Sequence, residues 1–170
     1  MPTVDESGLR KRIGAGELSG LFVVAGEEKY LVKRLAQQLI KRAAGDAFPE
    51  FNNQAFTNDS SLDSVGDAAQ ALPFFAQCVS VADFDVEAKS PQELEKLYEL
   101  WELAPESTTL VFWYPTLDFD GKRSSKWRKF LKQAEERGTV ALCARRGQGD
   151  LLRFVTREAE KAGCALPRQA

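Results

Sequence analysis

Residues 21–44 read LFVVAGEEKYLVKRLAQQLIKRAA, and their pattern indicates the fold class. It opens with the nearly continuous apolar run Leu21–Ala25, which is typical of a strand covered on both faces of a sheet. A short turn leads into a segment from Glu28 to Ala44 with helical periodicity. Its leucines recur every four residues, at Leu31, Leu35 and Leu39. A buried strand followed by a long amphipathic helix indicates a β–α unit of a parallel sheet.

The same alternation continues along the chain. Four further apolar, β-favouring runs follow: Phe51–Phe56, Cys78–Ala82, Thr109–Tyr114 and Thr139–Cys143. Helical spacing occurs at Ser61–Ala71, from Pro91 to Trp101, at about Lys122–Arg137 and at Asp150–Ala162. We therefore predict an α/β fold in which a parallel five-stranded sheet has helices on both faces.

The glycines of Ala144–Asp150 mark the best candidate boundary in the chain. We expect residues 1–146 to form one domain, and residues 147–170 to hold the first helix of a second domain. At 170 residues the chain is long enough to bury a substantial core.

Composition excludes several classes of function. The formal net charge of −2 gives no overall attraction to nucleic acid or membrane. The N-terminus lacks the apolar core of a signal peptide, and no apolar run has the length of a membrane span, so we expect a cytoplasmic protein with no membrane partner. The absence of histidine removes the commonest general base and metal ligand. Cys78, Cys143 and Cys164 are too scattered for a metal knuckle and are interpreted as buried thiols.

The turn Gly26-Glu27-Glu28 stands where a nucleotide-binding fold places its phosphate loop. A working loop needs several glycines, a lysine for the terminal phosphates and a serine or threonine for magnesium. This turn has one glycine and two acids, which suit the positive end of a helix dipole but would repel a triphosphate. We interpret Gly26, Glu27 and Glu28 as a helix cap and a degenerate nucleotide loop, and we expect no cofactor and no catalytic residue.

Two further sets of charged residues have a functional and a structural interpretation. Asp83 and Asp85 follow the third predicted strand, and Asp118 and Asp120 the fourth; without a phosphate loop, loop and cap roles are favoured over a magnesium site. Lys122, Arg123, Lys126 and Lys129 concentrate positive charge on one helix, with Arg128 and Lys132 beside them. A solvated helix face is the ordinary interpretation of such a surface, and contact with DNA or a partner is the alternative.

The most informative segment is QALPFFAQ at residues 70–77. A predicted helix ends here at Pro73, and Phe74 and Phe75 are adjacent, so both cannot face one core stripe. One interpretation is that both rings close the core before the third strand. The other is an exposed hydrophobic wedge that enters a pocket on a partner, where aromatic anchors concentrate binding energy.

Three segments together resemble the delta-subunit family of bacterial DNA polymerase III. They are FVVAGEEKYLVKRL at residues 22–35, QALPFFAQ at residues 70–77 and LLRFVTREAEKAGCAL at residues 151–166. They are similar, in order, to the family's first strand and degenerate loop, to its "LPFF" element, and to the helix that opens its second domain. Phe154 stands where tryptophan is frequent in that helix.

The resemblance implies an AAA+-like domain that has lost ATP binding and serves as a clamp-loader subunit, binding and opening the sliding clamp (beta) in DNA replication. It assigns Phe74 and Phe75 to a pocket on the clamp, with Leu72 and Pro73 shaping the helix end that presents them. It further implies a central place for the Leu21 strand, other loader subunits as partners through later domains, and DNA as an indirect partner.

The chain departs from the family in one respect that matters for binding. Basic residues commonly follow the "LPFF" element, whereas Gln77, Cys78 and Val79 follow it here. This puts flanking salt bridges to the clamp in doubt. The alternatives are a nucleotide-dependent ATPase of the same fold, which the acidic turn opposes, and a stand-alone DNA-binding protein that uses the Lys122–Lys132 helix, which the net charge opposes.

Overall fold

The computed structural model describes residues 3–46, 52–71, 77–117, 124–145 and 147–164. These residues build one six-stranded sheet in the order β1-β6-β2-β5-β4-β3, and every pairing is parallel. The strands are β1 (Thr3–Val4), β2 (Gly20–Gly26), β3 (Asn53–Thr57), β4 (Gln77–Ala82), β5 (Thr108–Trp113) and β6 (Gly138–Cys143). The predicted parallel α/β class is confirmed, but the predicted number of five strands is wrong.

The additional strand and one helix lie at the N-terminus, where no element was predicted. β1 has only two residues, too few for any hydrophobic pattern, and it pairs with β6 at the sheet edge. The helix α1 (Glu6–Ala15) begins at Asp5, whose side chain accepts a hydrogen bond from the Gly8 amide. Leu9 and Ile13, one turn apart, bury its inner side. This two-residue apolar stripe is the sequence signal that marks α1.

The remaining described helices agree with the predicted segments to within a few residues. They are α2 (Lys29–Ala44), α4 (Leu62–Gln70), α5 (Pro91–Leu103), α6 (Ser125–Arg137) and α7 (Gln148–Lys161). Serine caps set three of the starts. Ser61, Ser90 and Ser124 each accept a hydrogen bond from a backbone amide three residues later, and Ser90 forms a full capping box with Glu93.

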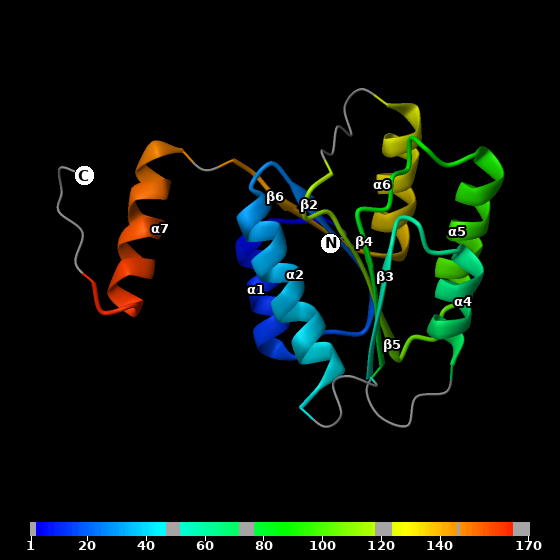
Figure 1. Cartoon of the computed structure of the whole chain (residues 1–170), viewed down its shortest axis with the longest axis horizontal. Coiled ribbons are helices and arrows are strands. Elements are labelled where there is room, and N and C mark those ends of the chain that lie inside the picture. The colour runs from blue at the N-terminus through cyan, green and yellow to red at the C-terminus, as the bar shows by residue number, and fades with distance from the viewer. Residues whose placement is uncertain (1–2, 47–51, 72–76, 118–123, 146, 165–170) are drawn as a thin grey trace.

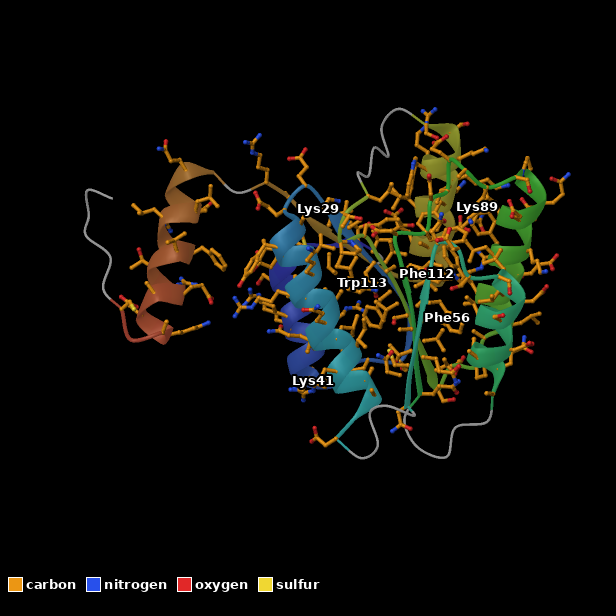
Figure 2. The ribbon with its side chains drawn as sticks, in the orientation of Figure 1. Lys29, Lys41, Phe56, Lys89, Phe112 and Trp113 are labelled. Carbon is orange, nitrogen blue, oxygen red and sulfur yellow. The ribbon has the colours of Figure 1, made fainter. Side chains whose placement is uncertain are left out.

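The sheet lies between two helical layers. Figure 1 shows α1 and α2 on one face and α4, α5 and α6 on the other. Each face has its own hydrophobic core, because successive side chains of a strand point to opposite faces. Figure 2 shows this for two neighbours on β5: Phe112 points toward the α4–α6 layer, and Trp113 points toward α2.

β2 lies in the interior of the sheet, between β6 and β5, as predicted for the Leu21 strand. Leu21 to Ala25 are all buried. β6 approaches β2 closely at Gly138. A Cβ at this residue would lie 2.3 Å from the Leu21 carbonyl oxygen. Glycine is therefore required where α6 turns directly into β6.

The cysteines only partly follow the prediction. Cys78 and Cys143 are buried in the core against α2, but Cys164 is exposed. Burial raises the pKa of the Cys78 thiol to about 12, so it is an unreactive apolar side chain at neutral pH.

α7 stands apart from the two layers. None of its described side chains is buried, and Leu151, Leu152 and Val155 are exposed. It meets α2 through an edge-to-face contact between Phe154 and Tyr30, with ring centroids 5.6 Å apart. An ion pair of 2.8 Å joins Arg34 to Glu158. None of the described helices is long and apolar enough to cross a membrane.

Candidate functional site

The turn from β2 to α2 lies at the carboxyl edge of the sheet, where open parallel sheets usually bind ligands. Gly26 has a φ of +142°, and a Cβ there would lie 2.2 Å from the Cys143 carbonyl oxygen. The same carbonyl accepts a hydrogen bond of 3.2 Å from the Glu28 amide. The turn is therefore packed directly against the end of β6, and the Glu28 amide is used within the protein.

Glu28 occupies the N-cap position of α2, as predicted, but its side chain makes no capping hydrogen bond. The next amide, that of Lys29, donates to the Glu27 carbonyl oxygen. A phosphate-binding loop needs such amides to be free and to point at the ligand. Here the amides of Glu28 and Lys29 instead donate to backbone carbonyl oxygens.

Lys29 is the residue at this edge that sequence reasoning missed. Its ammonium group donates to the Leu117 carbonyl oxygen at 2.6 Å and to the Tyr114 carbonyl oxygen at 3.4 Å. Figure 2 shows it at the beginning of α2. The sequence places Lys29 in the first turn after β2, at the carboxyl edge of the sheet, but the carbonyls that it contacts lie more than 80 residues away. Lys29 uses its charge to hold the turn that follows β5.

Asp83 holds the same turn from the other side. Its carboxylate accepts hydrogen bonds from the Thr116 amide and hydroxyl, and from the Leu117 amide at 2.9 Å. Partial burial would raise its pKa, but these bonds and the charge of Lys29 outweigh it and lower the pKa below the usual value. Asp83 also has a φ of +53°, a conformation that aspartate tolerates better than most residues.

The predicted loop interpretation of the acids agrees with the geometry of Asp83 and Asp85. Asp85 accepts a hydrogen bond from the Glu87 amide two residues later, and its own amide donates to Asn58. No group of three or more potential metal ligands occurs within the described ranges. Asp118 and Asp120 lie outside them.

The predicted basic surface is partly used inside the protein. Lys126 donates to the carbonyl oxygens of Glu87 and Lys89, which ties α6 to the loop before α5. Lys129 forms an ion pair of 2.6 Å with Glu95 and lies over the ring of Tyr98. Lys122 and Arg123 lie outside the described residues.

Leu72, Pro73, Phe74 and Phe75 also lie outside the described residues, but their two flanks are well defined. Gln77, at the start of β4, is buried and donates from its side-chain amide to the Ala68 carbonyl oxygen. The Thr108 hydroxyl donates to the neighbouring Ala69 carbonyl oxygen at 3.2 Å. These two bonds fasten the end of α4 to the starts of β4 and β5. Both ends of the "LPFF" segment therefore start from fixed, neighbouring points.

One family model matches the chain, and one solved structure has a similar fold. The family model described as "DNA polymerase III, delta subunit" matches residues 22–141, which span β2 to β6. Among solved structures, the chain is similar to the Bacillus subtilis DNA clamp loader delta protein (YqeN), with a TM-score of 0.69 and 17% sequence identity. That match covers 92% of this chain and 48% of the B. subtilis chain, so this chain spans about half of that protein's length. A search of curated proteins found no match.

Proposed function

Because this chain belongs to the delta-subunit family of DNA polymerase III, we propose that it binds and opens the sliding clamp during DNA replication. In this proposal it is a non-catalytic clamp-loader subunit. It acts on a partner protein by binding energy alone, and it meets DNA through the assembled loader.

The observation that carries the proposal is the apolar sequence Leu72–Phe75 between two fixed flanks, the end of α4 and the start of β4. The six residues that connect α4 to β4 are all apolar, and two of them are aromatic. The buried side chain of Gln77 and the hydroxyl of Thr108 fix the backbone on either side. A short apolar segment with two aromatic side chains suits a partner contact, because aromatic anchors concentrate binding energy. Phe74 and Phe75 are the proposed anchors, and Leu72 and Pro73 shape their approach.

The proposal includes an AAA+-like domain at residues 1–146 that has lost its nucleotide site. Support comes from the turn at Gly26, Glu27 and Glu28, whose acids and engaged amides leave no evident cradle for phosphate. Residues 147–170 are proposed to begin a second domain. In support, α7 buries no described side chain against the first one. Contacts with other loader subunits are proposed to use later domains, as the resemblance to the family implies.

The direct test is binding of the 170-residue chain to an immobilised bacterial sliding clamp, measured by surface plasmon resonance. The proposal predicts saturable binding. A matched surface that carries an unrelated ring-shaped protein should give no signal. Absence of binding at a chain concentration of about 100 μM, roughly −5.5 kcal/mol of binding free energy, would contradict the proposed function.

A further inference from the structure

A cleft opens on the side of the molecule away from α5. It lies between α7, the beginning of α1 and the residues that follow β6, and it encloses about 670 Å³. This volume is within the range of ligand-binding clefts, about 300–1,000 Å³. Figure 1 shows α7 standing beyond α1 and α2, joined to the end of β6.

The lining of this cleft carries excess positive charge once its internal pairs are set aside. Glu6 pairs with Arg10 at 2.7 Å, and Glu158 pairs with both Arg34 and Lys161. Asp5 caps the first turn of α1. Three arginines then remain opposite two carboxylates, that of Asp5 and that of Asp150 in the first turn of α7, which leaves an excess of one positive charge. They are Arg145, Arg153 and Arg157, and all three are exposed and make no ion pair within the described ranges.

The arrangement of these groups favours phosphate as the ligand. Arg153 and Arg157 are one helical turn apart and share the face of α7 that lines the cleft. Guanidinium groups bind phosphate oxygens in a planar, two-pronged geometry that lysine cannot provide. Three guanidinium groups around one cleft suit a ligand that carries several consecutive phosphates.

Phe154 adds an aromatic ring to the same lining. It lies between the two α7 arginines in the sequence, and the edge-to-face contact with Tyr30 holds it in place. Aromatic rings beside arginines are the combination with which proteins bind unpaired bases and their backbone. A carboxylate-rich peptide would use the arginines but would gain nothing from the ring.

We propose that this cleft binds single-stranded nucleic acid. Arg145, Arg153 and Arg157 contact successive phosphates, and Phe154 stacks on a base. The proposed residues differ from those of the "LPFF" segment, so the proposal can be tested independently of clamp binding.

The experiment is fluorescence anisotropy of a labelled oligothymidylate, about 12 nucleotides long, titrated with the 170-residue chain at several salt concentrations. Three phosphate contacts predict that log K falls with log salt with a slope of about −2. Arg153→Gln/Arg157→Gln should reduce this slope to about −0.7. Phe154→Leu should weaken binding by about five- to a hundredfold while leaving the slope unchanged.

The matched control is Arg128→Gln/Lys132→Gln, which removes two charges at the same spacing from the exposed face of α6. It should leave both affinity and slope close to the parent values, and circular dichroism should show that every variant keeps its helices. The proposal is overturned if the parent chain does not bind the oligonucleotide, or if the control and the α7 variant lose affinity equally. Equal binding of duplex DNA or of a glutamate-rich peptide would also overturn it.

Discussion

The lack of a side chain at Gly138 allows β6 to lie against β2. A Cβ at Gly138 would lie 2.3 Å from the Leu21 carbonyl oxygen, so Gly138→Ala must push the two interior strands apart. We expect this variant to lose about 1–3 kcal/mol of unfolding free energy in urea titrations. Gly14→Ala is the matched control, since nothing lies within 4 Å of the added carbon in α1. It should stabilise the protein by roughly 0.5–1 kcal/mol. Equal effects of the two changes would contradict the described approach of β6.

Asp83 makes the free energy of unfolding depend on pH. Its pKa in the folded protein is lowered, so its stabilising contribution is present above the ordinary aspartate pKa of about 3.9 and is lost as the pH falls through the lowered value. Asp83→Asn tolerates the φ of +53° but removes the charge. We expect it to cost about 1–2 kcal/mol at pH 7 and progressively less below pH 4. Unfolding free energies measured from pH 3 to pH 7 check this.

The control for Asp83→Asn is Asp63→Asn, which removes an exposed ion pair with Lys96. An exposed pair contributes little, so this variant should lose less than about 1 kcal/mol at every pH. If the loss of unfolding free energy caused by Asp83→Asn stayed constant down to pH 3, this would contradict a lowered pKa of the carboxyl that accepts hydrogen bonds from Thr116 and Leu117.

At the scale of elements, the β2–α2 turn determines whether the sheet can hold a nucleotide. The Glu28 and Lys29 amides donate to backbone carbonyls, and the Lys29 ammonium group is bonded to the carbonyls of Tyr114 and Leu117. We therefore expect no saturable, magnesium-dependent ATP binding up to millimolar concentration in isothermal titration calorimetry. The same titration with EDTA in place of magnesium is the control. A magnesium-dependent isotherm would restore the ATPase alternative.

The elements also show what sequence could and could not predict. β2, β5 and α2 were evident because their apolar residues follow one buried face or one helical stripe. β1 was missed because two residues carry no pattern, and α1 because its stripe has only Leu9 and Ile13. At the carboxyl edge, the glycine and acids of residues 26–28 indicate the turn between β2 and α2. The role of Lys29 depends on carbonyls more than 80 residues away, which no local pattern could indicate.

In the whole molecule, the two proposed binding functions belong to different segments of the chain. The sheet and its two helical layers form the body of the molecule, and Gln77 and Thr108 bond the end of α4, just before Leu72–Phe75 in the sequence, to β4 and β5. α7 lies apart and is joined to this body through Tyr30 and Arg34. Clamp binding and a nucleic-acid cleft on α7 would therefore be separable functions, each removable by substitution without loss of the other.

The most direct test of Phe74 and Phe75 as clamp anchors measures both clamp affinity and stability in Phe74→Ala/Phe75→Ala. If both rings are clamp anchors, binding should weaken by about 2–4 kcal/mol, or thirty- to a thousandfold, while unfolding free energy stays nearly unchanged. Leu103→Ala, at an exposed apolar residue, should change neither quantity, and Phe130→Ala, at a fully buried ring, should cost about 3–5 kcal/mol of stability. A double variant that loses as much stability as Phe130→Ala, while its folded fraction still binds the clamp, would contradict the assignment of Phe74 and Phe75 as clamp anchors.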